Sequence, residues 1–187
     1  FAVDGGSLSG TAAGAGGNDT LSGDIAYTVS GANSGSASAI GAWTGIENLE
    51  GTAGDDTFTF SGGSLTGTAD GLAGNDMFNI SATGGALELI GGLGDDTWNL
   101  TGDAVFTATV TGGSGSDTVN FGIPTGSPPG GDRSRLVGEV VLGVEVGDTD
   151  VLDFSGSDLA QIVVAQDAGG NEQFGTVRGA GPDMGFD

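Results

Sequence analysis

One acidic residue recurs through the middle of the chain at a nearly constant interval, and glycines precede it each time at the same two positions. The phrase has the form G-x-x-G-x-D-x-Φ, where Φ is apolar, and its four starts are 20, 20 and 21 residues apart. Carboxylates and backbone carbonyls are the oxygen ligands that Ca²⁺ prefers, and glycines let a turn aim its carbonyls at one centre. The phrase therefore predicts a calcium-binding turn. Its acidic residues are Asp56, Asp76, Asp96 and Asp117, and its glycines are Gly51, Gly54, Gly71, Gly74, Gly91, Gly94, Gly112 and Gly115.

The same residue types also form ordinary turns, in which the aspartate only hydrogen-bonds its own backbone. Stacked repeats, however, would align the carboxylates about 4.8 Å apart, which is the spacing of neighbouring strands. Like charges placed directly opposite each other are destabilising. We therefore favour a calcium site over a purely structural turn, and we expect Ca²⁺ to be the cofactor.

Each phrase leads into a short segment of alternating apolar residues, such as Phe58 and Phe60, or Trp98 and Leu100. Alternation with a period of two indicates a strand with one buried face. A turn and a strand that recur about every 20 residues are typical of a solenoid, in which each repeat forms one coil and stacks on the next. The sequence therefore predicts an all-β fold of stacked coils.

The phrase resembles the calcium-binding nonapeptide G-G-x-G-x-D-x-U-x of the repeat-in-toxin (RTX) family of bacterial secreted and surface proteins. The resemblance implies a right-handed parallel β-helix, calcium bound by the aspartates and the turn carbonyls, and an inward residue after each aspartate. RTX arrays usually place two nonapeptides in each coil of about 18 residues, whereas this chain has one per 20 or 21. We therefore expect one row of ions. The inward residues would be Phe58, Phe78, Trp98 and Val119.

A fifth copy of the phrase, Gly14 to Leu21, predicts that coiling begins near the N-terminus and makes Asp19 a further candidate ligand. The next copy starts 37 residues later, close to two coils, which leaves room for one degenerate turn around residues 31–35. We expect that coil to lack a calcium loop. Residues 1–50 are thus interpreted as degenerate coils and residues 51–121 as regular ones, within a single domain of 187 residues.

The period breaks at residues 122–135, where three prolines cannot donate to a sheet ladder, and we interpret this segment as a surface loop. Residues 136–187 are expected to hold further coils and a loose tail. Within them, D-T-D-V-L-D-F-S-G is similar to a phrase in the RTX region of serralysin-type metalloproteases. Their zinc site needs H-E-x-x-H, and this chain has no His. The phrase adds Asp148, Asp150 and Asp153 as weaker candidate ligands.

The composition excludes several classes of binding partner and of catalytic chemistry. Lys+Arg 3 against Asp+Glu 25 gives a net charge of -22, which excludes nucleic acid as a direct partner because phosphate binding needs clustered basic residues. The absence of Cys and His excludes thiolate catalysis, cysteine zinc sites and histidine bases. No segment reaches the roughly 18 apolar residues of a membrane span. We expect the fold of so acidic a chain to depend on a cation.

These observations predict a non-enzymatic structural protein that is extracellular or on the cell surface. Calcium would stiffen the solenoid, which would serve as an adhesin stalk or a filament subunit, as in the large bacterial adhesins that its repeats resemble. The apolar segment Phe1–Val3 has the character of an uncapped strand edge, which favours head-to-tail self-association. Contact with a cell surface or a polysaccharide is a second expectation.

Two other classes of function compete with this one. A β-helical module of a secreted enzyme that binds or modifies polysaccharide needs basic or tyrosine side chains around the reacting bond, and this chain has one Tyr and three Arg that are not clustered. A glycosidase pair would be sought at Asp55–Asp56 or Asp95–Asp96, but strand alternation points such neighbours apart. Ice binding would use a file of threonines at the third position of the phrase, which holds Gly16, Ala53, Ala73, Leu93 and Ser114.

Overall fold

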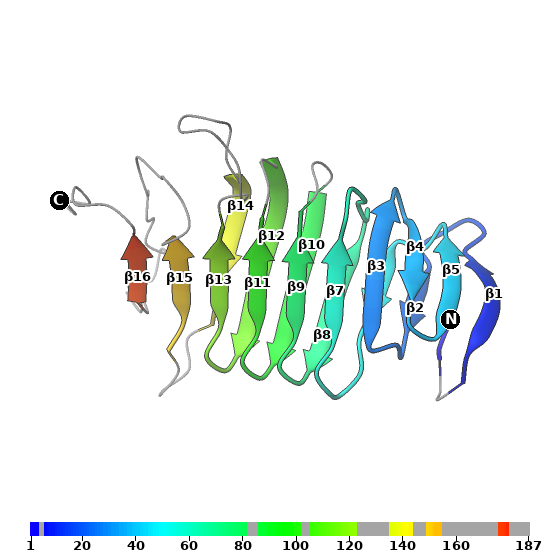
Figure 1. The fold of residues 1–187 in the computed structure, drawn as a ribbon, viewed down its shortest axis with the longest axis horizontal. Helices are drawn as coiled ribbons and strands as arrows, with labels where there is room; N and C mark the ends of the chain where they lie inside the picture. Colours follow the sequence, from blue (N-terminus) through cyan, green and yellow to red (C-terminus); the bar gives the residue numbers. More distant parts are fainter. Residues whose placement is uncertain are drawn as a thin grey trace.

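The computed structural model describes residues 1–3, 6–81, 86–101, 105–122, 135–143, 149–154 and 176–179. Within these ranges the fold is all-β and contains no helix. The strands form two sheets in which most neighbours are parallel, and Figure 1 shows them side by side in one elongated stack. This is the solenoid-like architecture that the repeats predict. Asp148, the C-terminal tail and nearly all of the loop expected over residues 122–135 lie outside the described residues.

From β6 to β15 the chain alternates between the two sheets, so each repeat contributes one strand to each sheet. The ten-stranded sheet has the order β1 (Leu8–Ala13), β5 (Ile40–Thr44), β4 (Ser34–Ala37), β3 (Ala26–Gly31), β7 (Thr57–Phe60), β9 (Met77–Ile80), β11 (Thr97–Leu100), β13 (Thr118–Phe121), β15 (Val151–Phe154) and β16 (Thr176–Gly179). The six-stranded sheet has the order β14 (Arg135–Val141), β12 (Val105–Ser114), β10 (Ala86–Leu93), β8 (Thr68–Ala73), β6 (Asn48–Glu50) and β2 (Thr20–Ser22).

The strands that follow the glycine-aspartate phrase pair in parallel without any slip of register. Phe58 lies opposite Phe78, Phe78 opposite Trp98, and Trp98 opposite Val119. All four side chains are buried, which confirms their predicted inward orientation. With Tyr27, the aromatic rings form one stack in which successive centroids are 5.2, 4.9 and 5.2 Å apart. Burial of such rings is the main source of stability in a fold of this kind.

The N-terminal strands depart from the degenerate coils expected for residues 1–50. Strands β3, β4 and β5 form an antiparallel meander, so the glycine-rich segment around Asn33 is a hairpin turn and not the turn of another coil. Asn33 adopts φ 46°, a left-handed conformation that asparagine tolerates better than most residues. The buried carboxylate of Asp24 accepts the backbone N–H of Ala39 at 2.6 Å and the hydroxyl of Ser38. These local contacts hold the chain in the meander.

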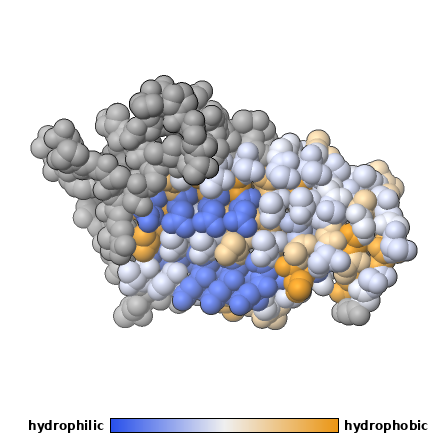
Figure 2. Space-filling view, in the orientation of Figure 1, coloured by the Kyte–Doolittle hydropathy of each residue, from blue (hydrophilic) through white to orange (hydrophobic). Residues whose placement is uncertain are grey.

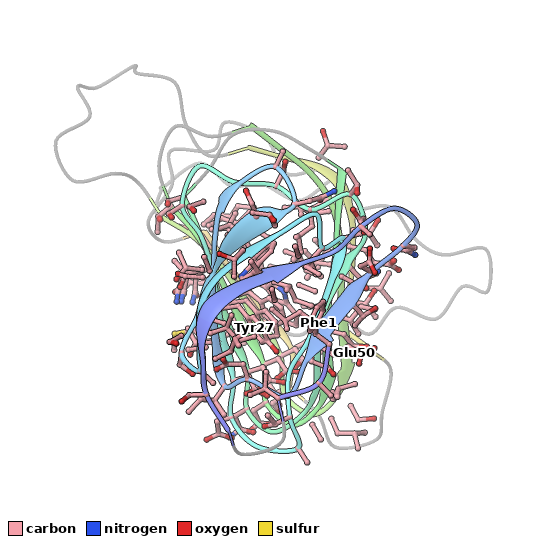
Figure 3. All side chains as sticks on the ribbon, turned by 90° about the vertical axis from the view of Figure 1, so that its right-hand side faces the viewer. Phe1, Tyr27 and Glu50 are labelled. Carbon is pink, nitrogen blue, oxygen red and sulfur yellow. The ribbon has the colours of Figure 1, made fainter. Side chains whose placement is uncertain are left out.

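Side chains fill the space between the two sheets, as the view along the stack in Figure 3 shows. Tyr27, on β3, lies within this space, and its hydroxyl donates to the carbonyl of Glu50, on β6, at 2.6 Å. The same hydroxyl accepts the N–H of Asp24 at 3.0 Å. Tyr27 therefore joins the two sheets near the N-terminal end of the stack, because β3 and β6 belong to different sheets.

Direct stacking of the turns explains the second glycine of the phrase. Gly94 has φ 122°, and a Cβ at this residue would overlap the carbonyl of Gly74 in the preceding repeat. Gly54 occupies the same position of the phrase in the first regular repeat, but a Cβ there would meet only the Thr52 hydroxyl, at 3.8 Å. Glycine is thus required at this position only where φ is positive and the turn of the preceding repeat packs against it. The position in the phrase does not by itself require glycine.

The same substitution at these two glycines should have very different effects. Gly94→Ala should lower the free energy of unfolding by more than about 2 kcal/mol, because it adds both an unfavourable φ and a backbone overlap. Gly54→Ala should change it by less than about 1 kcal/mol. Urea unfolding followed by circular dichroism measures both variants. Equal losses of unfolding free energy in the two variants would contradict the direct stacking of the turns.

Candidate metal centre

The four predicted carboxylates come together in one row. Asp56, Asp76, Asp96 and Asp117 each lie in the turn that leads from the six-stranded sheet into the ten-stranded sheet. Their exposed fractions are 1%, 1%, 0% and 0%, so the whole row, called here the aspartate file, is shielded from solvent. Aspartates are almost never fully buried unless they are paired, and the partners of this file are therefore its most informative feature.

In Asp76, Asp96 and Asp117, one carboxylate oxygen accepts a hydrogen bond from the preceding repeat. The Oδ1 atom of Asp76 accepts the backbone N–H of Asp56 at 2.8 Å, and the Oδ1 atom of Asp96 accepts that of Asp76 at 2.8 Å. Asp117 accepts the N–H of Asp96 at 2.9 Å in the same way. Asp150, a weaker sequence candidate, accepts the N–H of Asp117 at 2.9 Å and extends the file although it is 33 residues further along.

The second oxygen differs along the file. The Oδ2 atoms of Asp76 and Asp96 are buried and have no hydrogen-bond partner, whereas the Oδ2 atom of Asp56 accepts the N–H of Thr52 at 2.6 Å. A Cβ added to Gly91 would collide with Asp96 Oδ2 and would lie 2.8 Å from the carbonyl oxygen of Gly112. The first glycine of the phrase is therefore required because a carboxylate oxygen occupies the position that a Cβ would take, with a carbonyl oxygen close beside it.

Burial is the main cause that raises the pKa of Asp96 to about 7 and the pKa of Asp76 to about 6. Neighbouring aspartates raise these pKa values further, and the N–H of the preceding aspartate lowers them. Burial likewise raises the pKa of Asp56, against the hydrogen bonds from Thr52. Near neutral pH Asp96 is thus close to the balance between its protonated and ionised forms, and the ionised form of a buried carboxylate calls for a compensating cation.

A second ladder runs beside the file with the opposite polarity, and the sequence reasoning missed it. Asp55 Oδ1 accepts the N–H of Asn75 at 2.8 Å, and Asn75 Oδ1 accepts the N–H of Asp95 at 2.9 Å. Asp95 Oδ1 then accepts the N–H of Ser116 at 2.8 Å. The recurrence of short polar acceptors at the fifth position of the phrase was the signal for this ladder.

A third ladder lies on the outer face of the ten-stranded sheet. The side-chain amide of Asn99 donates to Asn79 Oδ1 at 3.0 Å, and that of Asn120 donates to Asn99 Oδ1 at 2.9 Å. Figure 2 shows hydrophilic bands that run along the stack over the repeats. The second and third ladders are formed by polar side chains at the surface. Hydrogen bonds therefore connect neighbouring repeats at the surface as well as in the buried aspartate file.

Two sequence candidates do not join the aspartate file. The strand after Asp19, β2, enters the six-stranded sheet, and Asp19 itself contacts Glu47, whose carboxylate accepts its N–H at 2.9 Å. The place before Asp56 in the file is taken by Ile25, since Thr57 donates to the carbonyl of Ile25 at 3.0 Å. Asp153 pairs with Asn120 on the neighbouring strand and is also outside the file.

Within the described part of the chain, no group of three or more His, Cys, Asp or Glu side chains is close enough to hold a metal. The protein thus provides one buried carboxylate per repeat, and any further ligands in these turns would be backbone carbonyls.

No helix among the described residues is long and apolar enough to cross a membrane. No family model matches the chain, and no curated protein or solved structure matches it either.

The role of Oδ1 is tested by two substitutions at one residue. Asp96→Ala should lower the free energy of unfolding by about 1 to 3 kcal/mol, because it leaves the buried N–H of Asp76 without its acceptor. Asp96→Asn keeps a side-chain oxygen for that N–H and should cost less. Asp95→Ala, on the exposed ladder, is the matched control, and urea unfolding in chelator at pH 5, where the raised pKa of Asp96 keeps its carboxyl protonated, measures all three. Equal losses for Asp95→Ala and Asp96→Ala would contradict the assigned role.

Stability in buffer without divalent cations should fall as the pH rises from about 5 to about 8. The pKa values of Asp96 and Asp76 in the folded protein, about 7 and about 6, exceed the ordinary value of 3.8. The folded protein therefore binds more protons than the unfolded chain in this range, and the stability contributed by protonation is lost as the pH passes the folded pKa values. Denaturant unfolding across the range measures the slope, which should flatten in an Asp76→Asn, Asp96→Asn double variant. Stability that rises with pH would contradict the raised pKa values.

Proposed function

We propose that the chain is a calcium-stabilised, non-enzymatic structural segment of an extracellular or cell-surface protein. In this proposal it is an RTX-like, right-handed parallel β-helix with about 20 residues per regular coil, as the register of β7, β9 and β11 suggests. It would serve as an adhesin stalk or as a filament subunit that makes end-to-end contacts. The observation that carries the proposal is the buried, hydrogen-bonded aspartate file with carboxylate oxygens that lack a donor.

The file suits a hard cation. A buried carboxylate oxygen without a hydrogen-bond donor is costly unless a proton or a cation compensates it. Ca²⁺ accepts carboxylate and carbonyl oxygens in a tolerant geometry, and Asp96 Oδ2 and the carbonyl oxygen of Gly112 both lie within 2.8 Å of the position that a Cβ of Gly91 would take. Asp76 and Asp96 are thus the residues best suited to hold calcium. Asp56 is less suited, since both of its oxygens accept hydrogen bonds from Thr52.

A structural role agrees better than catalysis with where the acids lie. The residues Asp56 and Asp96 are buried, so a substrate cannot reach them, and their neighbours Asp55 and Asp95 are engaged in the exposed ladder. Neither Asp55–Asp56 nor Asp95–Asp96 therefore presents two carboxylates to one bond, as a glycosidase requires. Repeats joined by three ladders and a continuous aromatic stack favour a stiff rod that carries load or spaces other domains.

Calcium should raise the melting temperature and the free energy of unfolding. At millimolar concentration, a site with a dissociation constant of ~10⁻⁴ M contributes about 1 to 2 kcal/mol. The test is urea unfolding at pH 7.5 in calcium, in magnesium, and in chelator with sodium chloride at matched ionic strength. The sodium control separates binding from simple screening of a chain of net charge -22.

The Asp76→Asn, Asp96→Asn double variant completes this test. It should lose most of the calcium response while remaining folded in chelator, because the substitutions remove the charge but keep an acceptor for each backbone N–H. A wild-type protein equally stable in calcium and in matched sodium chloride would rule out the calcium row. The structural role would then rest on the hydrogen-bonded ladders alone.

A further inference from the structure

The ten-stranded sheet ends at β1, and among the described strands β1 pairs only with β5. Within β1, Ala12 is buried and the other five residues are exposed. Figure 1 places β1 at the end of the stack, and Figure 3 shows it crossing that end. One edge of β1 is therefore left, within the described structure, with backbone groups that can pair with another strand.

This end of the molecule carries no charged side chain on its strands. Strands β1, β3, β4 and β5 contain no Asp, Glu, Lys or Arg, in a chain whose net charge is -22. The hydrophilic bands of Figure 2 lie over the repeats and stop before this end, where hydrophobic atoms gather. On β1 itself, Leu8 is 44% exposed. Two copies can thus bring their β1 edges together without placing like-charged strand residues opposite each other.

Two devices that protect an edge strand, charged side chains and proline, are missing from β1. The pairing of β1 with β5 has one irregularity, between Leu8 and Thr11. Beyond it, Thr11, Ala12 and Ala13 pair regularly with β5. The accessible edge is therefore short, and strand addition would use the regularly paired residues Thr11, Ala12 and Ala13.

We propose that β1 is the association surface for a second copy of this chain, which adds its own β1 in antiparallel orientation about a two-fold axis. A two-fold contact buries the same charge-free edge on both sides. Head-to-tail addition would instead pair β1 with β16, the strand at the opposite end of the ten-stranded sheet, and would leave the β1 edge of one copy in each pair uncovered. The contact gives the end-to-end joint of the structural role proposed above, but it does not depend on calcium.

The oligomeric state tests this contact directly. Light scattering after size-exclusion chromatography should give a mass that rises with concentration from 18.0 kDa toward twice that value, in chelator as well as in calcium. Thr11→Asp should hold the protein at the monomer mass, since the two-fold axis brings the new charges together. Thr107→Asp is the matched control, because Thr107 is equally exposed but lies on β12, between β10 and β14, and it should leave the dimer unchanged.

Cysteine cross-linking provides a second measurement, because the chain has no Cys. Gly10 accepts a side chain, since a Cβ there meets nothing within 4 Å. Gly10→Cys and Thr11→Cys, alone and mixed, should give a disulfide-linked dimer under mild oxidation at least tenfold faster than Thr107→Cys. Cross-linking no faster than in the control, or a wild-type protein that stays monomeric at high concentration, would overturn the proposal. Growth beyond the dimer would also overturn it, in favour of head-to-tail stacking. None of these results depends on whether calcium raises the melting temperature, so the two proposals fail separately.

Discussion

The hydrogen bond from the backbone N–H of one aspartate to the Oδ1 atom of the aspartate in the next repeat is the interaction on which the fold depends. It recurs from Asp56 to Asp117 and on to Asp150. It fixes the register between turns, and it draws each carboxylate out of water. The second oxygen is thereby buried as well, against the first glycine of the phrase. The glycine requirement, the raised pKa values and the need for a compensating cation all follow from this one geometry.

Two buried ladders therefore act in opposite directions on stability. The apolar ladder of Phe58, Phe78, Trp98 and Val119 stabilises the stack, by about 1.5 to 3 kcal/mol for each large side chain removed from water. The aspartate ladder destabilises it whenever an ionised carboxylate is left without compensation, and an uncompensated buried charge costs several kcal/mol. The two ladders have similar magnitudes and one residue of each kind per repeat. Under the calcium proposal, a cation bound at Oδ2 would therefore shift this balance in favour of the folded stack.

The regular repeats were predictable from the sequence because their period is constant. The interval of 20 or 21 residues identified the pairing of Phe58 with Phe78 and the alignment of the four aspartates. Features without that period were not predictable. The phrase at Asp19 has the right letters, but its strand enters the six-stranded sheet. Beside Asp56, at the start of the ten-stranded sheet's regular strands, the position is taken by Ile25 and not by Asp19. The meander of β3, β4 and β5 depends on Asp24, which contacts residues 38 and 39. Asp150 joins the file only after an interval of 33 residues, too irregular to extrapolate.

The most direct test of this account is the number of calcium ions bound per chain, measured by equilibrium dialysis at neutral pH for the wild type and for the Asp76→Asn, Asp96→Asn double variant. Both substitutions preserve an acceptor for the backbone N–H, so the comparison isolates the buried charge. The account predicts stoichiometric binding by the wild type and a loss of at least one ion per chain in the double variant. Absence of binding, or an equal number of ions in both proteins, would contradict it.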